Sequence, residues 1–189
     1  LLALEYGIHH PNHVSALVLV GTSPADYVGQ KAFLDEFTKT IKPLGDEITP
    51  ILSPEGMEPL DETEIQRLYL KLFSVYLYDP KNIDKMKIIM AKDSAISGNK
   101  TFGEMTKSYL FRPHVNLFPH LKTLNIPTLI IQGENDLVPL WTGQSIKEAL
   151  PRSEIVILKN CGHFPFFERP ELFFPEIRKF LEHIDVQEK

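Results

Sequence analysis

Cysteine, long apolar runs and clustered positive charge are all scarce in this sequence. Cys161 is the single cysteine among 189 residues, which excludes an internal disulfide and favours a reducing compartment. The longest apolar runs are far shorter than the roughly 20 residues that a membrane-spanning helix requires. The net charge is -5 and no tract of Lys and Arg is present, so the footprint of a nucleic-acid-binding protein is missing. These absences predict a cytoplasmic protein that binds neither membrane nor nucleic acid.

The N-terminal end also lacks features that a natural start would show. Residues 1–7 read as the middle of a helix, with no capping residue and no start methionine before them. A charged region and a small-residue cleavage site, which would mark a secretory leader, are missing as well. We therefore expect that the chain is truncated at this end.

Three apolar runs have the character of buried parallel strands. They are Ala16–Val20, Thr128–Gly133 and Glu154–Leu158, and each is nearly continuous rather than alternating. A helical pattern precedes the first run, another covers Thr142–Leu150 between the second and third, and a third begins at Pro170. This alternation predicts the α/β class, with a parallel sheet covered by crossover helices on both faces.

A long insertion without a strand signal separates the first two strands. Helical patterns recur through it, and its proline-rich part, Pro43–Pro59, is predicted to be a surface loop. We expect two domains: an incomplete core formed by 1–22 and 119–189, and an all-helical lid formed by 23–118. Four helices are predicted in the lid: Gly29–Ile41, a helix that includes Ile65 and Tyr76, Pro80–Lys92 and Phe102–Leu110. Asp61 and Glu64 form a possible capping box at the start of the second helix.

Two loops after consecutive strands carry residues suited to catalysis. Asp136 follows the strand that ends at Gly133, and His163 follows the next strand, 27 residues later. Alternatively, Asp136 caps the helix that follows it, and His163 is an ordinary core histidine. Because the carboxyl ends of parallel strands meet at one edge of a sheet, both side chains can converge there. Acid followed by histidine is the order described for α/β-hydrolases, in which the nucleophile precedes both.

Three segments of the sequence carry a resemblance to the α/β-hydrolase superfamily, and the resemblance extends over nearly the whole chain. The segments 133–139 and 162–165 resemble the acid loop and the histidine loop of that family. Residues 1–20 are similar to the helix and strand that follow the nucleophile elbow. The resemblance implies the C-terminal part of such a sheet, with the N-terminal strands and the Gly-x-Ser-x-Gly turn upstream of Leu1. Without a nucleophile, we expect the chain to be inactive and to need the missing segment for folding.

The resemblance implies a serine hydrolase that cleaves an ester or amide bond in a small molecule or short peptide. His163 would accept the serine proton, while Asp136 would orient the imidazole, and neither a cofactor nor a metal is expected. The lid is weakly similar to that of proline iminopeptidases around Leu72–Pro80. Two alternatives stay open: an aspartate nucleophile, as in dehalogenases and epoxide hydrolases, and a non-catalytic ligand-binding relative.

Other residues are candidates for secondary roles. Tyr76, Trp141 and Phe164 are proposed to line the substrate pocket, although aromatic rings near such loops often belong to the core. Between residues 43 and 66 there are seven acids and no Lys or Arg, which could hold a substrate ammonium group or simply be solvated. The histidines at 9, 10 and 13 are interpreted as a helix end rather than a metal site.

Overall fold

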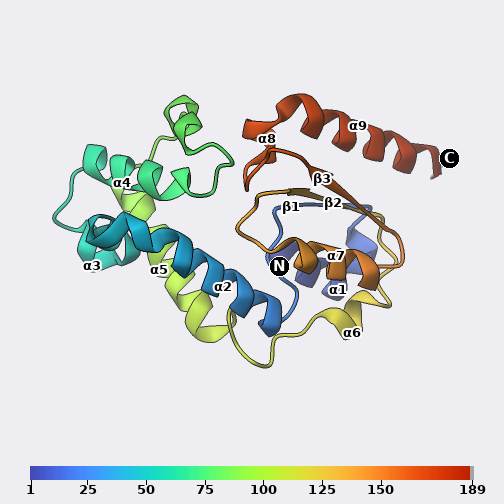
Figure 1. Ribbon diagram of the computed structural model, residues 1–189. Coiled ribbons are helices and arrows are strands. Elements are labelled where there is room, and N and C mark those ends of the chain that lie inside the picture. The colour runs from blue at the N-terminus through green and yellow to red at the C-terminus, as the bar shows by residue number, and fades with distance from the viewer. Residues whose placement is uncertain (188–189) are drawn as a thin grey trace.

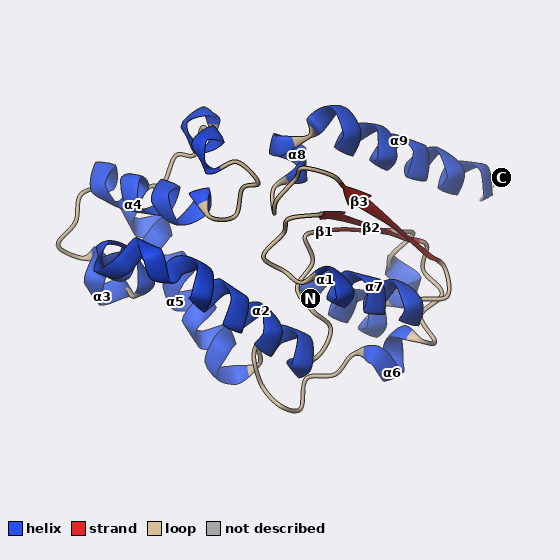
Figure 2. Ribbon diagram, viewed as in Figure 1, coloured by secondary structure: helices blue, strands red, loops and turns tan. Residues whose placement is uncertain are grey.

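A parallel sheet lies between two layers of helices (Figure 1, Figure 2). The computed structural model describes residues 1–187. Within them the strands are β1 (Leu17–Val20), β2 (Thr128–Gly133) and β3 (Ser153–Leu158), in the order β1-β2-β3 and all parallel. Every residue of the central strand β2 is buried, which explains its continuous apolar run. The predicted α/β class with a parallel sheet is confirmed.

Successive residues of β2 supply two separate hydrophobic cores. Ile130 packs with Leu4 and Ile146 on one face of the sheet. Leu129 and Ile131 point the other way and pack with aromatic residues of the last helix. The helices that cover the sheet are α1 (Leu2–His9), α6 (Phe118–Leu121) and α7 (Leu140–Ala149) on the first face, and α8 (Pro165–Glu168) and α9 (Pro170–Gln187) on the second (Figure 1).

The insertion forms a helical body beside the sheet, at the left of Figure 1. Its elements enclose a hydrophobic core of their own, in which Ile51, Ile65 and Leu68 are almost fully buried. We keep the division into core and lid as a proposal, which this separate packing supports. The elements are α2 (Tyr27–Ile41), η2 (Lys42–Leu52), α3 (Pro54–Met57), α4 (Glu62–Ser74), η3 (Pro80–Lys85) and α5 (Lys92–Ser108), with a further 3-10 turn, η1 (Pro11–His13), before β1.

The insertion leaves and re-enters the sheet region through two paired segments. The amide of Tyr27 donates to the carbonyl oxygen of Val115 at 3.0 Å, and the amide of Leu117 donates to that of Ala25 at 2.9 Å. These hydrogen bonds hold together residues that lie about 90 positions apart in the chain, as the isolated bridge between Asp26 and Asn116 also does. The chain therefore enters and leaves the helical body through two short segments that are hydrogen-bonded to each other.

Three predictions for the insertion were wrong. The stretch 43–59 is not a surface loop, because Ile48, Ile51 and Met57 are buried in the lid core on 3-10 and α-helical turns. Ile48 and Ile51 are three residues apart, which suits the 3-10 helix that carries them, because residues i and i+3 eclipse there. The helix predicted over 80–92 is only a 3-10 turn as far as Lys85, and 86–91 carry no helix. The helix expected from Phe102 begins ten residues earlier, at Lys92.

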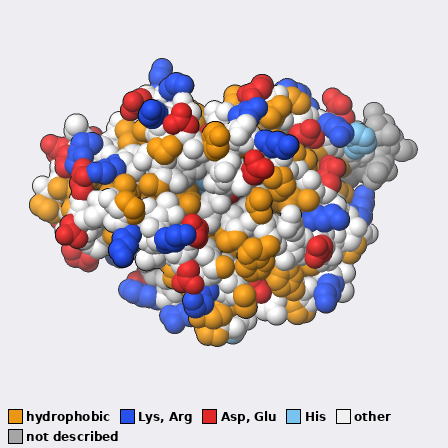
Figure 3. Space-filling model, viewed as in Figure 1, with side chains coloured by type: hydrophobic (Ala, Val, Ile, Leu, Met, Phe, Trp, Pro, Cys, Tyr) orange, Lys and Arg blue, Asp and Glu red, His pale blue; other side chains and the backbone are white. Residues whose placement is uncertain are grey.

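The surface offers no dominant charge of one sign on the visible face. Figure 3 shows Lys and Arg interspersed with Asp and Glu over the helical body. Across the described part of the chain, no helix has the length and apolar character needed to traverse a bilayer.

Candidate functional site

Asp136 and His163 lie at the carboxyl edge of the sheet, on loops that are bonded to each other. The amide of Asn135, in the acid loop, donates to the carbonyl oxygen of Cys161, in the histidine loop, at 2.8 Å. The approach is so close that a Cβ on Gly133 would overlap the carbonyl oxygens of Cys161 and Gly162. Glycine at 133 therefore allows the two loops to meet.

The structure brings the two predicted catalytic side chains into direct contact. His163 Nδ1 lies 2.8 Å from Asp136 Oδ1, within the range of a charge-assisted hydrogen bond. The Asp136 side chain is fully buried, while a quarter of the His163 side chain is exposed. The alternative role of Asp136 as a helix cap is not observed, because α7 has Pro139 at its N-cap and no side-chain cap.

A carboxylate accepts hydrogen bonds, so the contact suits the imidazole tautomer that carries its proton on Nδ1. When Nδ1–H donates to the carboxylate, the lone pair of Nε2 stays free to accept a proton. Asp136 Oδ1 also accepts from the amide of Val138 at 2.9 Å, which fixes the carboxylate. Among the residues that the structure describes, Asp136 Oδ2 is buried without a hydrogen-bond partner. A buried and only partly satisfied carboxylate stabilises a cation beside it more strongly than one in water would.

Gly21, directly after β1, borders the pair from the one strand whose following loop carries neither Asp136 nor His163. Its φ of +49° lies in the left-handed region that favours glycine. A Cβ there would lie 2.9 Å from Cε1 and 3.0 Å from Nδ1 of His163, closer than ordinary van der Waals contact. In the sequence this glycine is visible only as the end of a strand, so its contact with the imidazole could not be anticipated.

Gln132, in strand β2, holds the acid loop through a hydrogen bond, and the sequence pattern did not predict this role. Its buried side chain donates from Nε2 to the carbonyl oxygen of Val138 at 2.7 Å. A Cβ on Gly143 of α7 would overlap Gln132 Oε1, so the helix leaves room for this amide. A polar residue in the otherwise apolar end of β2 is the signal that could have revealed it.

Two of the three predicted substrate-binding aromatics lie beside the histidine. The ring centroids of Tyr76 and Phe164 are each 5.2 Å from that of His163, and the two rings are 5.9 Å apart. Burial raises the pKa of Tyr76 to about 12, with a smaller contribution from the charge of Asp136. Trp141 lies in the first turn of α7 with 44% of its surface exposed, and no ring contact among the described residues joins it to this group.

Cys161 lies next to the site but has the character of a core residue. It is fully buried, and burial raises the pKa of its thiol to about 12, with a further contribution from Glu168. A thiol with such a pKa is not a nucleophile near neutral pH. Cys161 therefore packs as a small apolar side chain.

The acid-rich stretch of the insertion is largely engaged in ordinary surface contacts. Glu47 pairs with Arg67 and Lys71, and Glu64 also pairs with Arg67. Asp61 caps α4 by accepting from the amide of Glu64. The interpretation of these acids as solvated, paired and helix-capping groups is therefore favoured over a site for an ammonium group.

The N-terminal histidines contact one another without forming a metal-ligand cluster. The rings of His10 and His13 lie 6.2 Å apart, and His9 pairs with Glu5 on the same helix. Over the described residues, no group of three or more His, Cys, Asp or Glu side chains is arranged to hold a metal ion.

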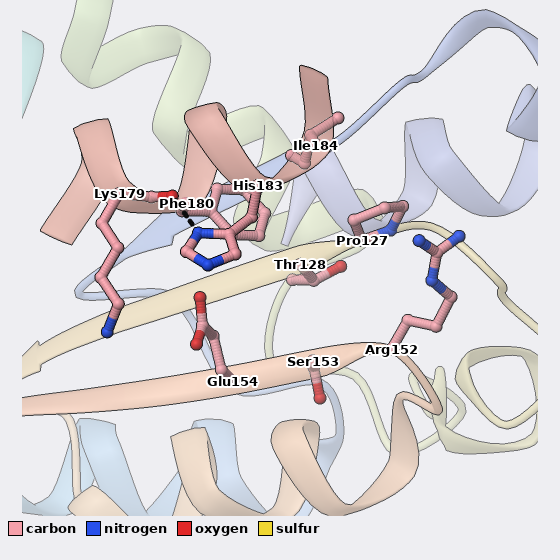
Figure 4. Close-up of a pocket in the computed structure, with 9 residues that line it drawn as sticks. All are labelled: Pro127, Thr128, Arg152, Ser153, Glu154, Lys179, Phe180, His183 and Ile184. Atoms are coloured by element: carbon pink, nitrogen blue, oxygen red, sulfur yellow. Dashed lines mark hydrogen bonds between the residues drawn. The ribbon is translucent and has the colours of Figure 1, made fainter. Parts of the chain in front are cut away.

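A cavity of about 260 Å³ lies at the opposite end of the strands (Figure 4). Residues from the beginnings of β2 and β3, including Thr128 and Glu154, face Lys179 and His183 of α9 across it. His183 Nδ1 lies 2.6 Å from the carbonyl oxygen of Lys179, an exposed contact within one helix turn. In open parallel sheets, sites form outside the carboxyl ends of the strands, so Asp136 and His163 are at the edge expected of a site and this cavity is not.

Comparisons with known proteins cover almost the whole chain. No protein-family model matches it. A 2-hydroxy-6-oxononadienedioate/2-hydroxy-6-oxononatrienedioate hydrolase of Pseudomonas putida is 26% identical over 187 residues, which are 96% of this chain and 59% of that protein. A pimeloyl-(acyl-carrier protein) methyl ester esterase of Vibrio vulnificus is 27% identical over 189 residues, 95% of this chain and 66% of that protein. The chain thus spans about three fifths to two thirds of these relatives.

Solved structures share the arrangement of helices and strands at lower identity. An alpha/beta fold family hydrolase from Bacillus anthracis matches with a TM-score of 0.70 and 13% identity, over 97% of this chain and 63% of that one. A proline iminopeptidase of Mycobacterium smegmatis matches with a TM-score of 0.61 and 16% identity, over 98% of this chain and 62% of that one. Identities this low show a common fold.

Proposed function

Because the chain belongs to the α/β-hydrolase superfamily, we propose that the complete protein is a hydrolase that cleaves an ester or amide bond in a small molecule or short peptide. The observation that carries the proposal is the 2.8 Å contact between His163 Nδ1 and Asp136 Oδ1 at the carboxyl edge of the sheet. Two sequence relatives that are themselves hydrolases support it.

The proposed reaction is acyl transfer in two stages. A serine outside residues 1–189 attacks the substrate carbonyl while His163 Nε2 takes its proton, and His163 then gives that proton to the leaving group. Water, activated by the same nitrogen, releases the acid from the acyl-enzyme. In both stages Asp136 stabilises the imidazolium and holds the tautomer. The proposal therefore requires a segment that supplies the nucleophile and the oxyanion hole.

The substrate is proposed to contact the aromatic rings beside His163. Tyr76 extends from the helical insertion and Phe164 from the histidine loop, so an apolar part of a substrate would lie between lid and core. A 2-hydroxy-6-oxononadienedioate is a second candidate substrate class, favoured by the name of the Pseudomonas putida relative; it has a ketone in place of an ester or amide, so attack at its carbonyl would break a carbon–carbon bond and the proton from His163 would go to the carbon leaving group. Proline iminopeptidase activity rests on shared fold alone.

The complete protein allows a direct test with His163→Ala and a panel of p-nitrophenyl esters, aminoacyl anilides and an oxo-dienedioate. We expect kcat to fall by about a thousandfold or more while the unfolding temperature stays close to that of the wild type. His120→Ala is the matched control, because that side chain is exposed on α6. Near-normal turnover by His163→Ala would contradict the mechanism.

A covalent probe identifies the nucleophile. A fluorophosphonate reacts with an activated serine, so we expect it to label the wild-type protein and to leave His163→Ala unlabelled. Turnover without labelling would favour the aspartate alternative. A wild-type protein that binds ligands from the panel but turns none over would favour the non-catalytic alternative.

A further inference from the structure

Glu168 accepts hydrogen bonds from main-chain amides of two distant segments. Its Oε1 accepts from Gly162 at 2.9 Å and from Phe164 at 3.3 Å, the residues on either side of His163. Its Oε2 accepts from the amide of Tyr78 at 2.7 Å, 90 residues earlier in the insertion. A single carboxylate thus joins the histidine loop to the helical insertion.

The two segments that Glu168 joins are also packed against each other. The amide of His163 donates to the carbonyl oxygen of Tyr76 at 2.8 Å. A Cβ on Gly162 would overlap that same carbonyl, so only glycine permits the approach. Because the Tyr76 ring lies against the imidazole, the backbone position of this segment decides what the histidine faces.

We propose that Glu168 is a positioning residue. It couples the position of the His163 side chain to the packing of residues 76–78 against the histidine loop. Hydrogen bonds to an ionised carboxylate are about twice as strong as neutral ones, so this junction is well suited to hold the two segments in register. Residues 76–78 then pack against the histidine loop only when the His163 side chain is in its observed position, and the reverse also holds. The catalytic consequence rests on the proposed function, whereas the coupling itself does not.

Two substitutions separate the two halves of the junction. In Glu168→Gln the side chain keeps its size but has one acceptor oxygen. We expect that oxygen to stay with Gly162 and Phe164, where it accepts from two amides. The new NH₂ group then faces the amide of Tyr78, and because both groups are donors, no hydrogen bond forms between them. Glu168→Ala removes all three bonds. Glutamine therefore releases the insertion selectively, and alanine releases both segments.

Amide hydrogen exchange in the complete protein measures the coupling directly. In Glu168→Gln we expect exchange at Tyr78 to be roughly 10- to 100-fold faster and exchange at Gly162 to be unchanged, because only one charge-assisted bond is lost. In Glu168→Ala both amides should exchange faster. Glu182→Gln, at an exposed position of α9, is the matched control and should leave both rates unchanged.

Steady-state kinetics on the same variants separate positioning from a merely structural role. We expect Glu168→Gln to raise KM about fivefold with kcat within about twofold, since the substrate-facing segment is loosened, and Glu168→Ala to lower kcat about tenfold as well. Unchanged exchange at Tyr78 in Glu168→Gln would overturn the proposal, as would equal acceleration of every amide. If the wild type turns over no substrate, the proposed function fails while the exchange result still decides the coupling.

Discussion

Replacing Gly21 with alanine should disturb the Asp136–His163 pair although neither of those residues is itself substituted. The added Cβ would lie 2.9 Å from His163 Cε1, and carbon atoms at ordinary contact are about 3.5 Å apart, so the ring must retreat by about half an ångström. A shift of that size along the 2.8 Å hydrogen bond takes it past the usual upper limit of about 3.2 Å. Since a 1 Å misplacement can cost about 100-fold, we expect kcat/KM to fall about tenfold.

Gly45→Ala separates this effect from the cost of the backbone. Gly45 also has a positive φ, of +62°, but a Cβ there would have no neighbour within 4 Å. Both variants should lose about 1–3 kcal/mol in urea unfolding, because each forces alanine to a positive φ, and at Gly45 the ψ of −154° adds a conformation that only glycine adopts readily. In a p-nitrophenyl ester assay only Gly21→Ala should lose activity. Equal activity of the two variants would refute the claim that Gly21 makes room for the imidazole.

Three further perturbations test separate parts of the site. Gln132→Leu removes the donor to the carbonyl oxygen of Val138, so we expect urea unfolding to show a loss of about 1–3 kcal/mol and kcat/KM to fall; unaltered kinetics would show that the acid loop needs no such support. Tyr76→Phe keeps the ring against the imidazole and should retain wild-type kinetics, whereas Tyr76→Ala should raise KM about fivefold; equal losses would assign the role to the hydroxyl instead. Burial raises the pKa of Cys161 to about 12 from an ordinary 9, so in mildly alkaline buffer the folded thiol stays protonated; mass spectrometry should find it alkylated by iodoacetamide only after urea unfolds the protein, and rapid alkylation of the native state would contradict its burial.

Hydrophobic pattern was sufficient to predict the sheet. The run Thr128–Gly133 coincides with β2, and the resemblance to α/β-hydrolases that its flanking loop suggested is confirmed by the relatives and by the solved structures. Consecutive parallel strands bring their following loops to one edge, so the meeting of Asp136 and His163 could be anticipated from strand order alone. Their catalytic role stays a prediction.

Contacts between distant segments could not be predicted in the same way. The bond from Tyr78 to Glu168 joins residues 90 positions apart, and nothing local in either segment indicates the partner. The prolines at 43, 50, 54 and 59 favoured a loop, because proline normally ends regular structure. Tertiary burial of Ile48 and Ile51 stabilises short turns there instead, which a propensity argument cannot anticipate.

The central claim is that Asp136 and His163 act as one unit, and a double-mutant cycle in the complete protein tests it most directly. Asp136→Asn, His163→Ala and the double variant would be compared by kcat on one ester substrate. If the 2.8 Å hydrogen bond is the basis of catalysis, removing Asp136 from a protein that already lacks the imidazole costs nothing more, and the double variant matches His163→Ala within about twofold. Losses that multiply would mean that the two residues act independently and would contradict the account.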